Sequence, residues 1–365
     1  MKTELYMKNF RGIKEGKIEF SQVNILLGPN NSGKSTILEA LFLLPNPARV
    51  VPYAKLEKKN RMKFQIRSLK AIELIHELHK TYESEGYVFL IHNYRSRECK
   101  ILLHTRSANL SLLLISNKFY IDLAMCEKDN EFFIKSLRKY ANTLDSNPAT
   151  EFCQKMKKLE NISPIESYIS SVTGEALYFH PNLLEYAWNY FASRWVEIVG
   201  PETTRRIAEK VSELVYDDYV DLLMEPFGDG KSALYLYMKD GRRIRLGDVG
   251  DGIKQIITLM LLYTITRPKF LLIDDVESHM NPVLLSFLTR WLADLVEKEN
   301  VNLIVSTHSI EAAKLIAGIM LELNPRIILT SIIDGELKCK YLTLEEVEEL
   351  EKSGVDVRVS QGLLL

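Results

Sequence analysis

The residues best suited to chemistry lie in the stretch GPNNSGKST, residues 28–36. It fits the pattern G-x-x-x-x-G-K-[ST], whose glycines let the backbone turn its N–H groups inward on a phosphate. We therefore expect Lys34 to reach the β- and γ-phosphates of a nucleotide and the Ser35 hydroxyl to ligate Mg²⁺. The nucleotide-binding residues predicted in this loop are Gly28, Asn30, Asn31, Ser32, Gly33, Lys34, Ser35 and Thr36.

A second apolar stretch, FLLIDD at residues 270–275, ends in two carboxylates. The end of a strand there can bring Asp274 to the Mg²⁺ that Ser35 holds, and Asp275 can polarise an attacking water. The predicted metal ligands are therefore Ser35 and Asp274.

A third apolar stretch, LIVSTHS at residues 303–309, ends in hydroxyls and a histidine. It belongs to the β–α unit that follows the acidic strand, which favours a functional His308 over a structural one. We expect His308 to hydrogen-bond the γ-phosphate or the attacking water. The predicted catalytic residues are Lys34, Asp275 and His308.

The stretch LGDVGDGIKQ, residues 246–255, is rich in glycine and opens a long apolar segment. Alone it is typical of the loop that leaves a hairpin. Beside the other motifs it indicates a second helix N-terminus that binds an anion. Its candidate contacts are Gly250, Asp251 and Gly252.

Strands and helices must alternate to position these motifs, and the two ends of the chain do so. Residues 2–27 predict three strands, and KSTILEALFLL has the spacing of a helix that starts at the loop. The last third alternates helix and strand, with capping-box spacing at Thr343 and Glu346 and a stop at Gly354. The predicted fold class is α/β.

The middle of the chain reads differently. SLKAIELIHELHKTYE predicts an amphipathic helix, and four apolar segments from residue 87 to 123 predict an antiparallel sheet. Residues 130–215 predict helical segments interrupted by proline, and SALYLYMKDGRRIRL predicts a hairpin that turns at Asp240-Gly241. His76 and His79 lack a third ligand nearby, so a solvated helix face is favoured over a metal site.

The composition is that of an ordinary globular protein: 365 residues, 46% hydrophobic and 26% charged, with a net charge of −1. No overall basic field marks nucleic-acid binding, although a local basic face is left open. Four cysteines without C-x-x-C spacing favour reduced thiols in a cytoplasm. The N-terminus has no signal-peptide core, and the longest apolar stretch, residues 256–265, is too short to cross a bilayer. We therefore expect a cytoplasmic protein without a membrane partner.

The order of these motifs resembles the ATP-binding-cassette-type ATPase heads. It is most similar to the branch that contains RecF, the structural-maintenance-of-chromosomes (SMC) proteins and the overcoming-lysogenization-defect ATPases. MKNFRGIKEGKIEF resembles the opening strand and F-R element of that branch, GPNNSGKST its Walker A, FLLIDDVESHMNP its Walker B and D-loop, STHS its switch histidine and GDGIKQ a diverged signature motif. The resemblance covers residues 1–45 and 225–320, and the middle only in outline. It implies a P-loop NTPase with an ABC-ATPase-like core, an N-terminal antiparallel β-subdomain and an inserted helical and β arm.

The resemblance also implies an ATP-dependent homodimer, with ATP and Mg²⁺ as cofactors. ATP would lie between the P-loop of one subunit and the signature residues Gly250, Asp251 and Gly252 of the other, beside a D-loop at 278–281. Hydrolysis would then release the dimer. Arg11, in the F-R element, is expected near the nucleotide, with a surface arginine as the alternative. The implied setting is DNA repair, chromosome maintenance or antiviral defence.

The sequence departs from the pattern of this family at three places. Asp275 stands where glutamate is usual, so slow turnover is expected. Glu277 is a candidate substitute base, although its place in the D-loop argues against that role. Gly250 stands where serine is usual. No Q-loop residue is clear, and the candidates are Gln65, His180 and Asn182.

Other functions compete with this interpretation. A GTPase would carry N-K-x-D, which NKFY at residues 117–120 fails to match, and a transporter ATPase subunit would have closer Walker motifs and a strict L-S-G-G-Q. An ATP-gated clamp or scaffold with little turnover fits Asp275 and the missing serine. No nuclease motif follows STHS, so a nuclease or effector would be a separate partner, and DNA binding is left open. The predicted domains are an N-terminal ATPase lobe at 1–45, an inserted arm at 46–225 and a C-terminal lobe at 226–365.

Overall fold

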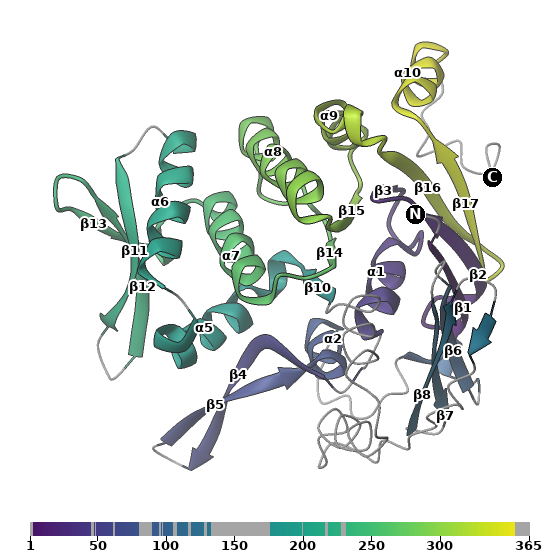
Figure 1. The fold of residues 1–365 in the computed structure, drawn as a ribbon, viewed down its shortest axis with the longest axis horizontal. Coiled ribbons are helices and arrows are strands. Elements are labelled where there is room, and N and C mark those ends of the chain that lie inside the picture. The colour runs from purple at the N-terminus through teal and green to yellow at the C-terminus, as the bar shows by residue number, and fades with distance from the viewer. Residues whose placement is uncertain are drawn as a thin grey trace.

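The computed structural model describes residues 3–44, 47, 49–60, 63–79, 90–94, 96, 98–104, 108–115, 118–127, 130–132, 176–198, 200–215, 218–227 and 231–354. In this part of the chain, twelve strands form one large sheet (Figure 1) with the order β10-β14-β15-β3-β16-β17-β2-β1-β6-β7-β8-β9. In chain order these strands are β1 (Thr3–Phe10), β2 (Ile13–Phe20), β3 (Val23–Leu27), β6 (Glu98–His104), β7 (Ala108–Ile115), β8 (Lys118–Glu127), β9 (Asn130–Phe132), β10 (Ala176–Phe179), β14 (Phe270–Ile273), β15 (Asn302–Thr307), β16 (Arg326–Ile333) and β17 (Glu336–Leu342).

The half of the sheet from β10 to β16 is parallel. β14 pairs with β10 and β15, and β3 pairs with β15 and β16. All five residues of β3 are buried, as expected for a strand that is covered on both faces. Because parallel strands end at the same edge, the segments that follow β3, β10, β14 and β15 gather there.

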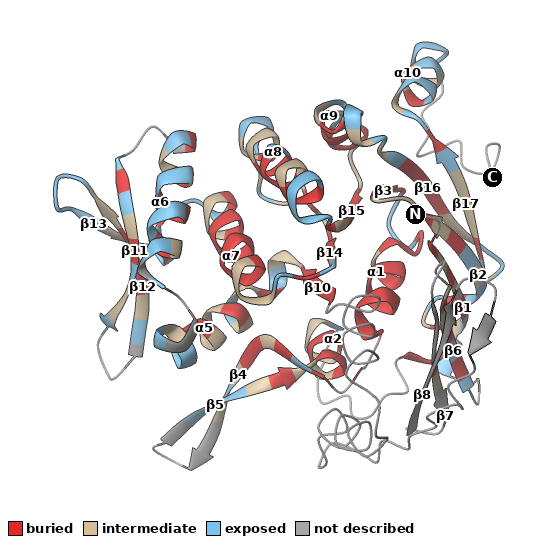
Figure 2. Cartoon of the chain, in the orientation of Figure 1, coloured by how far each residue is buried: buried red, intermediate tan, exposed pale blue. Residues whose placement is uncertain are grey.

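Helices cover both faces of the parallel strands. α1 (Lys34–Leu43) lies on one side, and α8 (Pro282–Glu299) and α9 (Ile310–Ile319) lie on the other (Figure 1). α7 (Asp251–Thr266) is buried over residues 255–263, as Figure 2 shows. α10 (Leu344–Lys352) begins with the predicted capping box of Thr343 and Glu346. The prediction of an α/β fold is confirmed.

The other half of the sheet is mainly antiparallel. β1 pairs antiparallel with β2 and β6, and β6 to β9 continue in the same way. The predicted antiparallel N-terminal sheet is therefore confirmed. The strand predicted at residues 87–94 is wrong in its described part, where Ile91 forms a single bridge and His92–Tyr94 is a 3₁₀ turn. Asn93 has a φ of 51°, a left-handed conformation that ends an extended strand.

Three strands were not predicted from the sequence. β4 (Val50–Asn60) and β5 (Lys63–Lys70) form a separate two-stranded sheet, and α2 (Ala71–His79) follows at once. The predicted helix therefore begins three residues later than its sequence pattern, which starts at Ser68. β10 has only four residues, too few to show a period. Within 130–215 the described helices are α5 (Leu184–Ile198) and α6 (Pro201–Val215), while residues 133–175 lie outside the described residues.

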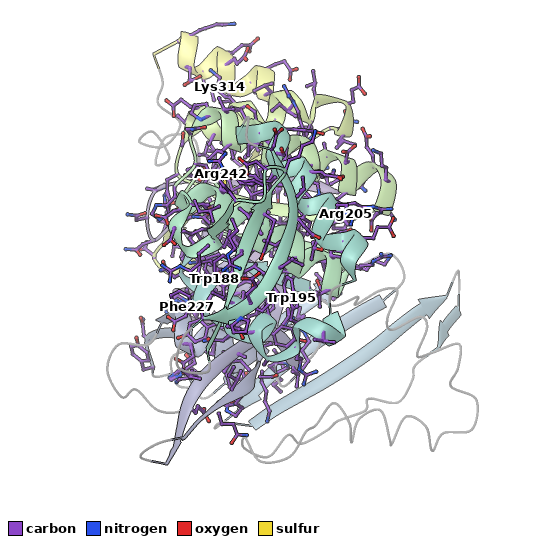
Figure 3. The ribbon with its side chains drawn as sticks, turned by 90° about the vertical axis from the view of Figure 1, so that its left-hand side faces the viewer. Trp188, Trp195, Arg205, Phe227, Arg242 and Lys314 are labelled. Carbon is purple, nitrogen blue, oxygen red and sulfur yellow. The ribbon has the colours of Figure 1, made fainter. Side chains whose placement is uncertain are left out.

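A third sheet, with the order β11-β12-β13, packs beside α5 and α6. Its strands are β11 (Tyr219–Phe227), β12 (Lys231–Met238) and β13 (Arg243–Arg245), and Gly241 with a φ of 86° turns the predicted hairpin. Figure 3 views this end of the molecule, with Trp188 and Trp195 on α5 and Phe227 on β11. Trp188 Nε1 donates to Thr258 Oγ1 at 2.9 Å and so ties α5 to α7.

The range predicted as an inserted arm, residues 46–225, joins the large sheet at two places. β6 pairs with β1, and β10 pairs with β14. Segments of this range therefore lie beside both predicted lobes, and the predicted boundary at 225 falls within β11. The three-part division of the chain stays a prediction.

Candidate functional site

The loop between β3 and α1 folds tightly around itself. Gly33, at the start of α1, has a φ of 94°, in the left-handed region that a side chain disfavours. A Cβ on Gly28 would lie 2.7 Å from Ser32 Oγ and 2.8 Å from the carbonyl oxygen of Thr330. Ser32 is buried, and its hydroxyl lies 3.1 Å from Thr330 Oγ1. The positive φ gives a physical reason for Gly33, and the close approaches give one for Gly28.

The remaining residues of the loop differ in exposure. Asn30 and Asn31 are exposed at its tip. In the first turn of α1, Lys34 and Thr36 are buried and Ser35 is half-buried. Ser35 is therefore the more accessible of the two hydroxyls in this turn.

The Lys34 ammonium lies inside the loop. Its Nζ donates to the carbonyls of Gly28 and Pro29, at 2.9 Å each, and lies 3.2 Å from His308 Nδ1. Burial lowers the pKa of Lys34, and the charges of three nearby carboxylates partly offset that effect. A buried ammonium beside carbonyl oxygens is well suited to receive an anion, because the anion compensates the charge directly.

Asp274, the first residue after β14, is 1% exposed. Tyr178, on the neighbouring β10, donates its hydroxyl to Asp274 Oδ2 at 2.8 Å. Ser306, on β15, donates its hydroxyl to Asp274 Oδ1. Two neighbouring strands therefore fix this carboxylate, and each oxygen keeps a further lone pair.

Asp275 and His308 face each other across the ends of β14 and β15. Asp275 Oδ1 lies 3.2 Å from His308 Nε2, and His308 Nδ1 lies 3.1 Å from the carbonyl oxygen of Gly28. Burial, followed by the charge of Asp274, raises the pKa of Asp275. Asp275 also has a φ of 50°, a conformation that costs energy in a residue with a side chain. A carboxylate with a raised pKa beside a histidine can accept a proton from water.

Glu277 contacts the backbone of the same histidine. Its Oε1 accepts a hydrogen bond from the N–H of His308 at 2.8 Å. Its Oε2 is buried and has no hydrogen-bond partner among the described residues. The structure thus brings Lys34, Asp274, Asp275, Glu277 and His308 into one site.

Arg11 lies in a neighbouring cluster beside α1. Burial lowers the pKa of Arg11, and the charges of Tyr178 and Asp274 partly offset that effect. Its guanidinium pairs with Glu39, which is fully buried on α1, and lies 2.8 Å from His79 Nε2. The same His79 nitrogen is 2.6 Å from Glu39 Oε1. The Arg11 side chain is 20% exposed, so it is not a freely solvated surface arginine. Its predicted role at the nucleotide stays a prediction.

The predicted signature residues begin α7 and contact the loop before α8. A Cβ on Gly252 would lie 2.6 Å from Leu284 Cδ1 and 2.8 Å from the carbonyl oxygen of His279. Gly250 and Asp251 are exposed, and Asp251 pairs with Lys254 at 2.9 Å. Apart from Gly250 itself and its neighbours in the chain, no described atom lies within 4 Å of the position that a Cβ would take on Gly250.

The Q-loop candidates lie in different places. His180 follows β10, and its Nε2 lies 3.9 Å from Asp275 Oδ2. The backbone N–H of Asn182 donates to His180 Nδ1 at 3.0 Å. Gln65 is exposed on β5. His180 is therefore the candidate that the structure places beside the acidic residues.

The sequence indicated no role for Tyr178, Ser306 and Glu39. It favoured a solvated helix face for His79, whose Nε2 instead lies 2.6 Å from the buried Glu39. Tyr178 lies in the short apolar segment ALYF, where a tyrosine reads as a core residue. Ser306 and Glu39 lie within motifs that were recognised for other residues. A polar side chain inside an apolar segment is the one signal that would have marked Tyr178.

The described part of the chain has neither a membrane-spanning helix nor a cluster of metal-binding side chains. None of its helices is both long enough and apolar enough to cross a bilayer. Within the same residues, no three or more His, Cys, Asp or Glu side chains gather as a metal site.

Comparison with known proteins gives similarity over most of the chain. It is 20% identical to an ATP/GTP phosphatase of Helicobacter pylori, over 87% of both proteins. Over 40 residues it is 58% identical to an uncharacterized protein, MJECL10, of Methanocaldococcus jannaschii, and covers only 18% of that protein. Over 63 residues this chain is 33% identical to a second uncharacterized protein of the same organism, MJECL11, and covers 55% of that protein.

Solved structures share the fold. An Smc head domain of Pyrococcus furiosus with an extended coiled coil, bound to the C-terminal domain of ScpA, has a TM-score of 0.51 at 14% identity, over 96% of this chain and 98% of that one. An SmcHead bound to the C-winged helix domain of ScpA also has a TM-score of 0.51, at 16% identity, over 95% and 98% of the two chains.

Two protein-family models also match parts of this chain. Residues 128–313 match an AAA-domain family described with AbiEii toxins of type IV toxin–antitoxin systems. Residues 1–193, which carry the phosphate loop, match the family described as AAA ATPase domain. Since this second match spans more than half of the chain, the protein belongs to the AAA ATPase domain family.

Proposed function

We propose that this protein binds Mg-ATP in the loop at residues 28–36 and hydrolyses it slowly to ADP and phosphate. The observation that carries the proposal is the contact between three strand ends. His308 lies 3.2 Å from both the Lys34 ammonium and the Asp275 carboxylate. A phosphate bound by Lys34 would therefore have a base and a histidine beside it.

The residues present fit a nucleotide and its metal. The buried Lys34 ammonium has carbonyl oxygens as its close partners, so a phosphate would relieve the cost of its burial. Ser35 and Asp274 would hold Mg²⁺, which supplies charge neutralisation of the phosphates when bound. Tyr178 and Ser306 keep Asp274 oriented toward that role.

Hydrolysis would depend on Asp275 and His308. The raised pKa of Asp275 suits a group that accepts a proton from the attacking water. Aspartate is one methylene shorter than the glutamate usual in the resembling ATPases, so we expect the water to be held less well and turnover to be slow. His308 would orient the water or the γ-phosphate.

The proposal extends to an ATP-dependent homodimer. Gly250 and Asp251 are exposed at the start of α7, where a phosphate held by another subunit could approach them. We place the protein in the RecF, SMC and overcoming-lysogenization-defect branch, acting in a cytoplasm in DNA repair, chromosome maintenance or defence. The SMC heads of similar fold are bound to ScpA, and this supports a separate protein partner here.

A clamp or scaffold that binds ATP with little turnover is the second candidate. Two residues favour it: the short Asp275 and Gly250 in place of a serine. The two candidates differ in phosphate release and not in binding.

Nucleotide binding and phosphate release therefore test the proposal. We expect Lys34→Ala to weaken Mg-ATP binding at least about tenfold, because it removes the buried charge that meets the phosphates. We expect Asp275→Asn to retain binding and release phosphate at least about 100-fold more slowly. Lys298→Ala, at an exposed lysine paired with Asp294, is the matched control and should change neither quantity.

Binding that survives Lys34→Ala unchanged would refute the phosphate-loop assignment. Tight binding by the wild type with no phosphate release would favour the clamp instead.

A further inference from the structure

Glu277 is the one carboxylate of the site that the proposed hydrolysis does not use. Its Oε1 accepts the N–H of His308 at 2.8 Å. Its Oε2 is buried without a hydrogen-bond partner among the described residues. Burying a carboxylate oxygen without a hydrogen-bond partner costs free energy. We therefore expect the hydrogen bond made by the other oxygen to have a functional role.

The position of His308 in the chain explains why its N–H needs a partner. β15 ends at Thr307, and Ser309 caps α9 by accepting from the N–H of Ala312. His308 thus lies in the turn between strand and helix, where neither ladder supplies an acceptor. An ionised carboxylate forms a strong hydrogen bond there, and its charge is favourable close to a helix N-terminus.

Two other hydrogen bonds join the same loops nearer to the strands. The N–H of Asp275 donates to Ser306 Oγ at 3.0 Å, and the N–H of Val276 donates to the carbonyl of Ser306 at 3.1 Å. Both act at Ser306, two residues before His308. The bond from Glu277 extends this connection to the histidine itself.

We propose that Glu277 is a positioning residue that holds His308 in place for ATP hydrolysis, an inference that rests on the proposed function. By fixing the backbone of His308, it keeps Nε2 at 3.2 Å from Asp275 and Nδ1 at 3.1 Å from the Gly28 carbonyl. Loss of the acceptor frees the turn and lets the ring leave both partners. Binding through Lys34 does not depend on this bond.

Two substitutions separate the acceptor from the charge. Glu277→Ala should lower kcat about tenfold or more while the Kd for Mg-ATP changes less than about threefold, because a misplaced ring affects the chemical step. Glu277→Gln keeps an oxygen that can accept from the N–H, so its kcat should exceed that of the alanine variant at least about fivefold. Glu299→Ala is the control: it removes a glutamate that accepts from Tyr263, at the far end of α8.

Amide hydrogen exchange at His308 gives a readout without nucleotide or turnover. We expect exchange to be faster than wild type in Glu277→Ala, restored in Glu277→Gln and unchanged in Glu299→Ala. Wild-type exchange in Glu277→Ala would overturn the proposal. So would a glutamine variant that restores protection but not kcat, since the charge of Glu277 would then be the essential feature.

A wild-type protein that hydrolyses no ATP would refute the proposed function. The exchange experiment would still decide whether Glu277 fixes His308.

Discussion

At the residue scale, a buried ion pair changes the pKa of a neighbouring histidine. The residues concerned are Arg11, Glu39 and His79. Glu39 is fully buried and pairs with Arg11, so its charge is already compensated. Burial, followed by the charge of Arg11, lowers the pKa of His79 to about 4 even though Glu39 Oε1 lies 2.6 Å away. The cluster joins the turn after β1, helix α1 and the end of α2. It therefore links the helix that follows the phosphate loop to Arg11 and to α2.

The lowered pKa predicts a pH dependence of stability with a definite sign. The unfolded chain binds the His79 proton near pH 6.5, whereas the folded protein binds it near pH 4. Between these values the unfolded state holds more protons, so the free energy of unfolding decreases as pH falls from about 6.5 to 4. His79→Gln removes this titration and should show a smaller loss between pH 7 and pH 5. Denaturant unfolding at several pH values measures both slopes, and equal slopes would show that His79 does not titrate in this way.

The same residue scale shows what the sequence could and could not predict. Lys34, Asp274, Asp275 and His308 could be found because each follows an apolar strand, and parallel strands end at one edge. Glu277 was also named from the sequence, but its hydrogen bond to the backbone of His308 was not, and Tyr178 and Ser306 were not named at all. Side-chain hydrogen bonds between distant segments depend on packing, which no local pattern records.

At the element scale, some helices and strands were predictable and others were not. Periodic helices such as α7, α8 and α10 were predictable, whereas β10, with four residues, and the β4–β5 pair, rich in charge, were not. The contact of Gly252 with His279 and Leu284 is equally invisible in sequence, because it depends on how two elements pack.

Gly252 and Gly250 provide a matched pair of tests for this contact. Gly252→Ala should lower the free energy of unfolding by about 1–3 kcal/mol, because the new methyl would meet the backbone oxygen of His279. Gly250→Ser should leave stability within about 0.5 kcal/mol or raise it slightly, since serine is a good helix cap and no described atom lies within 4 Å. Urea unfolding followed by circular dichroism measures both. Equal stability of the two variants would mean that α7 can move away from the loop at no cost.

At the scale of the whole molecule, one sheet joins strands from both ends and the middle of the chain. β10 lies at one edge, β3 is the fourth strand from that edge, and β6 to β9 lie toward the other edge. Paired strands therefore connect the phosphate loop to elements far away in sequence. An ATP-driven change in assembly is part of our proposal, and it can be tested without knowing the partner.

Light scattering of Asp275→Asn and the wild type, with and without Mg-ATP, tests the assembly. We expect the variant to double its mass only with Mg-ATP, because it holds the nucleotide without releasing phosphate, while the wild type returns to the monomer. Adding Gly250→Glu to Asp275→Asn should abolish the doubling and leave ATP binding unchanged, since the new carboxylate would repel a phosphate held by the other subunit and no described atom crowds that position. If the mass of every variant is the same with and without nucleotide, a dimer that holds ATP between two subunits is refuted. The start of α7 would then be an ordinary helix N-terminus, and the output of ATP binding would lie within the single chain.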